Sequence, residues 1–326
     1  MLVVLNADYK EYCATATSNG MEYILGLDAG ATKTSSVITD KSGTVLGRGA
    51  AGPASLISST EKDFKINVKK AIDAAIVSSG KDIKQFVAAG FGGAGIDTEK
   101  TYKEARKMLE PIIDLVDKDN LVIVNDTQLI LPACSDSGYG VAVIAGTGSN
   151  FYGKNKEGEE AGAGGFDYLL SDEGSGYWVG LKVLHAIAKS EDGRGKKTVL
   201  EDIVKDHFSV YSIRDMMDIV YEESFKKRDV ADLAILADKA YKDGDAVAES
   251  IFEDTVDEIA LGINTVIGKL NMQDEDIDIV AVGGMFNSPY PLKDNIMKKI
   301  TNKKAEFIIC KKDLAEGAAR LAIDLI

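Results

Sequence analysis

One pattern of strands and turns occurs twice in this chain, and the repeat restricts the folds that the chain can adopt. The first copy runs from "YILGLDAG" (23–30) through "TSSVITD" (34–40) and the tight turn "KSG" (41–43) to "TVLGRGA" (44–50). The second copy is "GVAVIAGTGSNFYGKNKEGEEAGAGG" (140–165), which again predicts strand, glycine turn, strand, "NKEG" turn and strand. We interpret the two copies as an internal duplication, with a chance match of turn residues as the alternative.

The two copies align at an offset of 115 residues. The aligned pairs are Thr32 with Thr147, Thr34 with Ser149, Gly43 with Gly158, Gly47 with Gly162, and Gly49 with Gly164. Alternating helical and buried-strand patterns follow each copy, which indicates α/β layers. A chain of 326 residues has room for two such domains. We therefore predict an α/β fold with duplicated domains at 21–135 and 136–313, and we place the closing helix 314–326 with the first.

Hydrophobic periodicity locates the remaining elements. Phe64, Val68, Ile72 and Ile76 recur at nearly four-residue spacing, as in an amphipathic helix. Helices are predicted at 61–80, 98–113, 173–190, 196–207, 212–223, 230–242, 244–270 and 314–326. Buried strands are predicted at 85–93, 120–126, 277–286 and 304–312.

The net charge of the chain limits the classes of partner that it can bind. Its 38 basic and 52 acidic residues give a net charge of −14, which argues against nucleic acid or an anionic membrane as a main partner. A phosphate ligand remains compatible, because backbone amides and a metal ion can hold phosphate. No apolar run approaches the length of a membrane span. We expect a cytoplasmic protein.

Two further features of the sequence concern its N-terminus and its cysteines. The start "MLVVLNADYK" has no basic leader and no clear cleavage site, so residues 1–20 are predicted to be an extension of little structure, with Met21 as an alternative start. Cys13, Cys134 and Cys310 form neither a disulfide framework nor a C-x-x-C pair, and we expect reduced thiols.

A glycine-containing turn follows the first strand of each copy. In the first copy it is "DAGATKT" (28–34), whose backbone amides can surround an anion. Its candidate phosphate contacts are Gly30, Thr32, Lys33 and Thr34. Asp28, at the end of the strand, is placed to hold Mg²⁺ through water. A plain β-hairpin turn is the alternative, because an isolated glycine motif is a weak signal.

The equivalent turn of the second copy is "AGTGSN" (145–150). Two such loops facing one another across a cleft would hold β- and γ-phosphates from both sides. The pair therefore favours phosphate binding more strongly than either loop does alone. The candidate contacts in this second loop are Gly146, Thr147, Gly148 and Ser149.

Two further motifs follow buried strands. Asp126 in "IVND" (123–126) lies where α/β proteins form ligand sites, and it could accept the proton of a hydroxyl that attacks a phosphoryl group. Capping of the next helix is the compatible alternative. In "VGGMF" (282–286) paired glycines let a flat ring such as adenine lie against bare backbone, and close helix–strand packing is the alternative.

The stretch "GGFDYLLSDEGSGYW" (164–178) places two acids among glycines at the start of a predicted helix. Glu173 is explained as a charge complementing the helix dipole in the first turn. The dipole explanation does not account for the glycines Gly165 and Gly176, which keep the backbone open around Asp172. Trp178, the one tryptophan of the chain, is predicted to pack in the core.

As a set, these motifs resemble the BadF/BadG/BcrA/BcrD-type ATPases of the actin-like, hexokinase-like ATPase superfamily, and within it the N-acetylglucosamine kinases. The order and spacing of the motifs cover residues 21–326. The resemblance implies two RNase-H-like domains with a hinge and with ATP between them. The motifs that carry it are "DAGATKT", "GFGGAG" (90–95), "ND" (125–126), "AGTGS" (145–149), "GGFDYLLSDEGSGYW" and "VGG" (282–284).

The resemblance also implies roles for residues. Asp126 would be the general base for the sugar hydroxyl, Asp28 would lie near Mg²⁺, and Gly283 and Gly284 match the adenosine loop. The implied activity is an ATP-dependent amino-sugar kinase that phosphorylates the 6-hydroxyl of N-acetylglucosamine or a close relative, and a homodimer is the expected assembly. Sugar contacts are expected from Ser55, Gly93, Asn125, Asp126, Gly165, Asp172 and Gly176.

The sequence departs from the family pattern mostly on the sugar side. Ser55 stands near the place of a sugar-contacting asparagine, Phe166 and Asp167 replace a Trp-Gly pair, and Ser171 replaces a glycine. On the phosphate side, "GGGTKT" of the family is "AGATKT" here. N-acetylmuramic acid and glucosamine therefore stay open as substrates beside N-acetylglucosamine.

Two other function classes fit parts of the pattern. One is an ATPase activator that delivers electrons to a dehydratase or reductase. Such relatives hold an iron–sulfur cluster through cysteines at a dimer interface, and Cys134 is the candidate here, without a second cysteine near it in sequence. The other class is non-enzymatic, an actin-like filament subunit or a sugar-responsive regulator. No helix-turn-helix extension precedes the first strand, and the acidic charge disfavours DNA.

Overall fold

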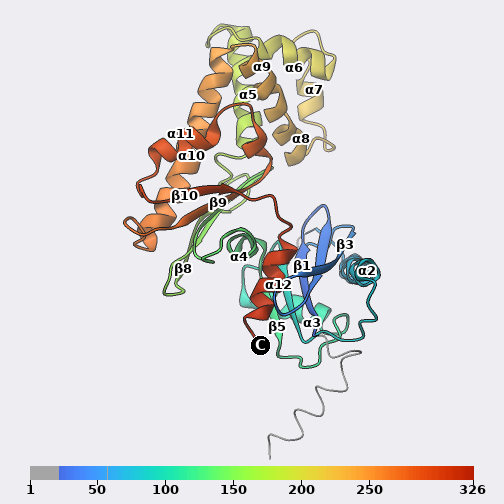
Figure 1. Cartoon of the computed structure of the whole chain (residues 1–326). Helices are drawn as coiled ribbons and strands as arrows, with labels where there is room; N and C mark the ends of the chain where they lie inside the picture. The colour runs from blue at the N-terminus through green and yellow to red at the C-terminus, as the bar shows by residue number, and fades with distance from the viewer. Residues whose placement is uncertain (1–21, 57) are drawn as a thin grey trace, which may run out of the picture. The chain divides into compact units, whose positions relative to one another are not determined.

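The computed structural model describes residues 22–56 and 58–326, so the prediction for residues 1–20 lies outside the described residues. The chain divides into two compact units. Figure 1 shows their helices and strands, with a colour that runs along the chain by residue number. The first unit contains the described residues up to Gly138 and then Cys310–Ile326, and the second unit is Tyr139–Ile309. The closing segment of the chain therefore belongs to the unit in which the chain begins.

A five-stranded mixed sheet forms the centre of the first unit. The antiparallel strands β1 to β3 are the predicted meander, and β4 and β5 extend the sheet in parallel from β1. The order across the sheet is β3-β2-β1-β4-β5. The strands are β1 (Ile24–Ala29), β2 (Thr34–Thr39), β3 (Val45–Ala51), β4 (Ala88–Gly93) and β5 (Leu121–Asn125).

Helices cover both faces of this sheet. Because side chains alternate along a strand, Leu25 and Leu27 of β1 pack with the core on which helix α2 (Glu61–Ser79) lies, and Ile24 packs with helix α12 (Ala315–Ile323). Figure 1 shows α12, in red, lying along β1. The remaining elements of the unit are α3 (Glu99–Leu109), the 3₁₀ helix η1 (Asp126–Leu129) and α4 (Ile130–Cys134).

The contact between α12 and the sheet requires glycine in the strands. An added Cβ at Gly26 would lie 2.1 Å from Ala315 O, and one at Gly90 would lie 1.9 Å from Ala318 O. These backbone oxygens cannot move without moving the helix. Glycines in β1 and β4, opposite the alanine-rich sequence of α12, therefore allow the helix backbone to approach the sheet closely.

The second unit repeats the sheet of the first, which confirms the predicted duplication. Its order, β8-β7-β6-β9-β10, has the same antiparallel and parallel neighbours as the first sheet. The turn between the first two strands is one residue shorter here, between Ala145 and Ser149, than between Ala29 and Thr34. The strands are β6 (Gly140–Ala145), β7 (Ser149–Lys154), β8 (Glu160–Gly164), β9 (Asp278–Val282) and β10 (Glu306–Ile309).

The helices of the second unit share one continuous core with its sheet. Phe252, Ile259 and Ile263 of α10 are almost fully buried in the same cluster as Val141 and Val143 of β6. The helices are α5 (Gly176–Asp192), α6 (Leu200–Phe208), α7 (Met217–Val220), α8 (Lys227–Asp232), α9 (Ala234–Lys242), α10 (Ala246–Lys269), the 3₁₀ helix η2 (Gly284–Asn287) and α11 (Leu292–Lys299).

Several helical predictions differ from the structure. The segment predicted as one helix at 212–223 holds only the four-residue α7, and α8 and α9 occupy the region of the helix predicted at 230–242. The strand predicted at 277–286 ends at Val282, where Gly283 takes a left-handed backbone, φ 117°. Helix α11 has no counterpart among the predicted elements.

The cysteine prediction is wrong for two of the three residues. Cys134, the last residue of α4, and Cys310, which follows β10, form a disulfide with their Cα atoms 5.7 Å apart. The two cysteines are 176 residues apart in the chain, and both belong to the first unit. Return of the chain to that unit brings them together, which sequence spacing alone does not reveal. Cys13 lies outside the described residues.

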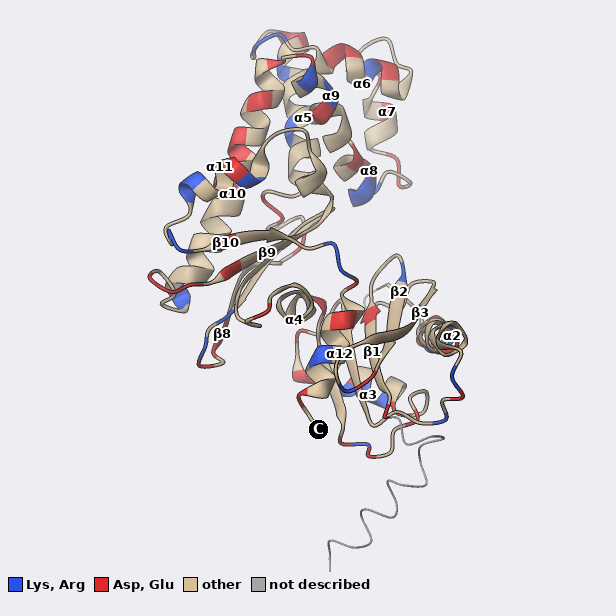
Figure 2. Cartoon of the chain, in the orientation of Figure 1, with Lys and Arg blue, Asp and Glu red and all other residues tan. Residues whose placement is uncertain are grey.

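Charged side chains lie mostly on helices and connecting segments, as Figure 2 shows, while the strands carry few. This distribution agrees with sheets that are buried in the interior of each unit. Within residues 22–56 and 58–326, none of the helices combines the length and apolarity needed to cross a bilayer.

Candidate functional site

The predicted catalytic residues of the first unit lie at one edge of its sheet. Three neighbouring parallel strands end there in register, with Ala29 beside Gly93 and Gly93 beside Asn125. Asp28 is the penultimate residue of β1, and Asp126 directly follows β5. The parallel topology thus brings together Asp28, Gly93, Asn125 and Asp126, which are up to 98 residues apart in the chain.

Asp28 carries an unusual charge environment. Burial raises its pKa to about 7, and the negative charges of Asp126 and Asp313 contribute to the rise, while Lys33 opposes it. Asp313, two residues before α12, was not singled out from the sequence, although it directly follows the strand predicted at 304–312. The return of the chain to this unit places its charge near Asp28.

The pKa of Asp126 depends on a different set of neighbours. Burial raises its pKa, the hydrogen bond from the Thr127 N–H at 3.0 Å lowers it, and the charge of Asp97 raises it again. The net effect is a raised pKa, which makes the carboxylate a stronger base than an exposed aspartate. The predicted capping role belongs to the preceding residue, since Asn125 is the N-cap of η1 and its Oδ1 accepts from Thr127 N at 2.9 Å.

Asn125 is itself held by a second residue that the sequence did not single out. Its Nδ2 donates to Asp97 Oδ1 at 2.8 Å, and its backbone N–H donates to Gln128 Oε1 at 3.0 Å. Asp97 follows the glycine-rich end of β4. It therefore orients Asn125 and places a negative charge near Asp126 at the same time.

The first glycine turn is a closed loop with exposed side chains at its tip. The Gly30 N–H donates to Lys33 O at 2.9 Å, and Thr32 and Lys33 are exposed. Thr34 is buried, and its hydroxyl donates to Gly52 O at 2.8 Å, so this side chain ties the loop to the end of β3. Ser55 is buried in the segment that follows β3.

The second glycine turn is fastened to the start of α5. Gly146 N–H donates to Gly148 O at 2.9 Å across the turn, and Gly146 O accepts from Gly176 N–H at 2.8 Å. Thr147 O accepts from Tyr177 N–H at 3.2 Å, and Thr147 itself is exposed. The Ser149 hydroxyl donates to Glu173 O at 2.7 Å. The loop and the predicted sugar-side stretch thus form one hydrogen-bonded assembly.

The two acids of that stretch do not lie in the first turn of a helix, so the helix-dipole explanation of Glu173 is wrong. Helix α5 begins at Gly176, with Ser175 as its N-cap, and its first turn contains no acidic residue. Asp172 is instead buried, with 4% of the residue exposed, and its Oδ1 accepts from Ser149 N–H at 2.9 Å. Trp178 is partly buried and packs against the core of the unit, with Lys182 Nζ 4.6 Å from its ring centroid.

The candidate glycines of the second unit occupy close approaches. Gly165 has φ 77°, and an added Cβ there would lie 2.7 Å from Asn150 Oδ1. Gly283 has φ 117°, and its Cβ would lie 2.2 Å from Ala145 O, beside the second glycine turn. Gly284 is exposed and has open space around it. Bare backbone at 283–284 thus borders the loop 146–149 within this unit.

The carboxylates at the edge of the first sheet suit a magnesium ion. Mg²⁺ prefers oxygen ligands and usually binds through one or two carboxylates, waters and substrate phosphates. Burial is the main cause of the raised pKa of Asp28, the negative charges of Asp126 and Asp313 add to it, and a divalent cation near these carboxylates would lower it. Among the described residues no three His, Cys, Asp or Glu side chains are close enough to hold a metal directly. Asp28 and its neighbours thus offer the carboxylate oxygens that a mostly hydrated Mg²⁺ uses.

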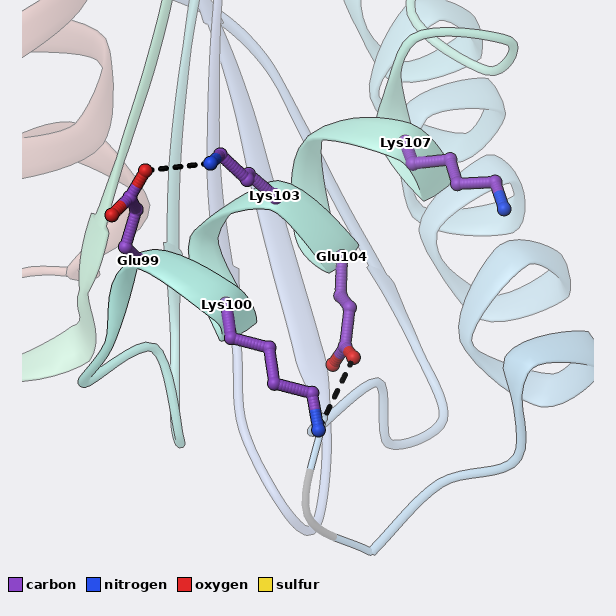
Figure 3. A pocket seen from close by; sticks show the side chains of 5 residues that line it. All are labelled: Glu99, Lys100, Lys103, Glu104 and Lys107. Carbon is purple, nitrogen blue, oxygen red and sulfur yellow. Dashed lines mark hydrogen bonds and ion pairs between the residues drawn. The ribbon is translucent and has the colours of Figure 1, made fainter.

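A surface hollow on α3 is a different kind of feature. Figure 3 shows the side chains that line it, and its acids and bases pair with one another, Glu99 with Lys103 at 2.6 Å and Lys100 with Glu104 at 3.9 Å. These side chains are 55–84% exposed. They form the solvated face of an amphipathic helix.

Known proteins resemble this chain over nearly its whole length. It is 32% identical over 305 residues to an N-acetylmuramic acid/N-acetylglucosamine kinase of Clostridium acetobutylicum, which covers 93% of this chain and 98% of the relative. It is 29% identical over 321 residues to an N-acetyl-D-glucosamine kinase of Dictyostelium discoideum, with the same coverage of both chains.

A solved structure shares the fold. The crystal structure described as a putative N-acetylglucosamine kinase from Chromobacterium violaceum superposes with a TM-score of 0.72 at 22% identity, over 93% of this chain and 99% of that one. The two-unit α/β architecture with duplicated sheets is therefore that of a known fold. The sequence model of the BadF/BadG/BcrA/BcrD ATPase family matches residues 25–322. The chain belongs to the BadF/BadG/BcrA/BcrD ATPase family.

Proposed function

We propose that this protein is an ATP-dependent amino-sugar kinase that transfers the γ-phosphoryl group of ATP to the 6-hydroxyl of N-acetylglucosamine or N-acetylmuramic acid. The observation that carries the proposal is the conjunction of family membership with two intact glycine turns and a raised-pKa carboxylate, Asp126, at a sheet edge. The similarity to the Clostridium acetobutylicum kinase supports the sugar class.

Asp126 is the proposed general base. A sugar hydroxyl attacks the γ-phosphorus, its proton passes to the Asp126 carboxylate, and the bond from phosphorus to the β-phosphate oxygen breaks to release ADP. Burial and Asp97 raise the pKa of Asp126, which increases its basicity for this transfer. Asn125, fixed by Asp97 at 2.8 Å, is the proposed neighbouring hydrogen-bonding group for the sugar.

The phosphate groups are assigned to the two glycine turns. In the first, Lys33 and Thr32 are exposed at the tip and are the proposed side-chain contacts. In the second, exposed Thr147 and the backbone of 146–149 are the proposed contacts. Asp28 is the proposed ligand of the hydrated Mg²⁺, which when bound supplies charge neutralisation on the phosphates.

The sugar-side assignments are Ser55, Gly93, Asn125, Asp126, Gly165, Asp172 and Gly176. The polar side chains among them already have partners within the protein. Asn125 donates to Asp97 at 2.8 Å, and Asp172 accepts from Ser149 N–H at 2.9 Å. We therefore propose that Asp172 contacts the sugar while it also holds the loop 146–149.

The activator class relies on cysteine ligands for an iron–sulfur cluster. Cys134, the cysteine on which that class would depend, is bonded to Cys310 in the first unit. This pairing favours the kinase as the function to test first.

The decisive assay is ADP release by the purified full-length protein with Mg²⁺ and ATP. The sugars are N-acetylglucosamine, N-acetylmuramic acid, glucosamine, N-acetylmannosamine and glucose, with a no-sugar control. We expect turnover with at least one of the first two, and ³¹P NMR of the product should show a 6-phosphate. Equal ADP release with and without every sugar would refute the kinase proposal.

A further inference from the structure

A lysine outside all the sequence motifs bridges two aspartates in the second unit. Lys227 is the first residue of α8, and its Nζ lies 2.5 Å from Asp167 Oδ1 and 2.6 Å from Asp172 Oδ2. The Asp167 side chain is 68% exposed, so solvent screens that pair. The Asp172 side chain is 5% exposed, and a buried carboxylate without a counter-charge is costly. The Asp172 carboxylate therefore depends more on the charge of Lys227 than the Asp167 carboxylate does.

Asp172 transmits this contact to the second glycine turn. Its Oδ1 accepts the hydrogen bond from Ser149 N–H at 2.9 Å, while Lys227 holds the other oxygen. An added Cβ at Gly148 would lie 2.7 Å from the same Oδ1, so the carboxylate rests directly against the loop backbone. Lys227, Asp172 and Ser149 form one continuous chain of contacts from α8 to the loop.

The two aspartates that Lys227 contacts both have an unfavourable backbone conformation. Asp167 has φ 63° and Asp172 has φ 71°, in the left-handed region that usually belongs to glycine. A non-glycine residue there costs about 1 kcal/mol or more. Both aspartates nevertheless carry side chains that meet the same ammonium group, so the strained positions are occupied by the two residues that Lys227 pairs with.

Lys227 itself is held in a fixed place. An added Cβ at Gly180 would lie 1.8 Å from Val230 O, which shows how closely α8 packs on α5. The Tyr168 ring centroid is 5.6 Å from Lys227 Nζ. Burial lowers the pKa of Lys227, but its hydrogen bond to Asp167 and its ion pair with Asp172 outweigh burial and raise it, so the ammonium stays charged.

We propose that Lys227 is a positioning residue for the loop 146–149, which holds the Asp172 carboxylate against the Ser149 N–H and so keeps the loop amides in place for the phosphates of ATP. The inference rests on the proposed function, in which this loop binds the β- and γ-phosphates. It assigns α8, a helix without a recognisable motif, a part in nucleotide binding.

The test compares two nucleotides that differ in the phosphates this loop is assigned to hold. Isothermal titration with MgCl₂ measures the Kd of ATP and of AMP for the wild type and for Lys227→Met, which keeps most of the side-chain length without the charge. We expect ATP binding to weaken about tenfold, because a charge-assisted contact is lost, and AMP binding to change less than about twofold. Lys227→Arg should restore ATP binding, because a guanidinium can pair with both carboxylates.

Two matched controls isolate the pair with Asp172. Asp167→Asn removes the exposed partner and leaves Lys227 with Asp172, so it should bind ATP like the wild type. Lys299→Met removes a lysine that pairs with Asp257 on the exposed surface of the same unit, and it should also bind ATP like the wild type.

Three results would overturn the inference: unchanged ATP binding in Lys227→Met, equal weakening of ATP and AMP, or no restoration by arginine. Thermal melting accompanies each titration, and Lys227→Gln serves as the second neutral variant if the methionine variant does not fold. Failure of the proposed function has a different signature. A wild type that binds ATP and phosphorylates no sugar refutes the kinase while the comparison of ATP with AMP still decides the role of Lys227.

Discussion

The Asp172 carboxylate accepts a hydrogen bond from the Ser149 backbone at 2.9 Å, across 23 residues of chain. This contact joins the stretch predicted to select the sugar to the loop predicted to bind phosphate. Asp172 therefore serves the loop in the protein before any ligand enters, and its replacement should affect both binding functions.

Asp172→Asn tests this double role. The amide keeps an acceptor for Ser149 N–H but loses the ion pair with Lys227, and its N–H₂ group faces the ammonium. We expect the free energy of unfolding to fall by about 1–3 kcal/mol and the KM values for ATP and sugar both to rise. Urea unfolding and steady-state kinetics measure these effects. A change confined to the sugar KM would mean that the contact with Ser149 is dispensable for the loop.

Asp126→Asn tests the general base. The change is nearly isosteric and removes the proton acceptor, so kcat should fall by about 10²–10⁴-fold while the Kd of ATP changes little. Asp119→Asn is the control, because Asp119 is an exposed aspartate of the same unit, with 95% of its side chain accessible. Sugar phosphorylation by the Asp126 variant at near the wild-type rate would contradict the base assignment.

Asp28 gives a prediction for the pH dependence of stability in the absence of Mg²⁺. Its pKa is about 7 in the folded protein and near 3.8 in an unfolded chain, so between these values the native state binds the extra proton. Stability contributed by this proton is therefore present below about pH 4 and is lost as pH rises to about 7. A shift of about three pH units sets an upper bound of about 4 kcal/mol on this loss.

Asp28→Asn should remove that loss. We expect the variant to be about 1–3 kcal/mol more stable than the wild type at pH 8 and nearly equal to it at pH 4, in the presence of EDTA. Urea unfolding at both pH values measures the difference. A stability difference that does not depend on pH would show that the pKa of Asp28 is not raised in the folded protein.

Gly90→Ala tests the close approach of α12 to the first sheet. Its Cβ would lie 1.9 Å from Ala318 O, so the helix must move, and we expect destabilisation of about 1–3 kcal/mol or more. Gly268→Ala, near the end of α10, is the matched control, because nothing lies within 4 Å of its added Cβ. The control should be neutral or stabilising by up to about 1 kcal/mol. Equal stability of the two variants would argue against tight packing of α12.

The disulfide between Cys134 and Cys310 predicts a difference in thiol count. Thiol titration of the denatured protein should yield two more reactive thiols after reduction than before. Because the bond closes a loop of 176 residues, its removal in Cys134→Ser should lower the free energy of unfolding by about 2–5 kcal/mol. Identical thiol counts with and without reductant would show that the pair is reduced in the isolated protein.

Local sequence determined much of this protein. Strand periodicity and turn residues predicted both meanders, and the 115-residue offset predicted two sheets of one topology. Their agreement has a physical basis, because alternating burial and glycine or asparagine turns act over a few residues. The positions of Asp28 and Asp126 after buried strands likewise follow from the local pattern, although their roles in catalysis stay predictions.

Tertiary structure decided what distant segments do to one another. Nothing local in the sequence indicates that Asp313 acts on the pKa of Asp28, that Cys310 meets Cys134, or that Lys227 pairs with Asp172. Each relationship joins segments at least 55 residues apart, and each depends on how helices and strands pack after they form. Glu173 shows the same limit at short range. The sequence "SDEGSG" resembles a helix start, but the hydrogen bonds between Asp172, Ser149 and the carbonyl of Glu173 hold both acids outside the helix, whose first residue is Gly176.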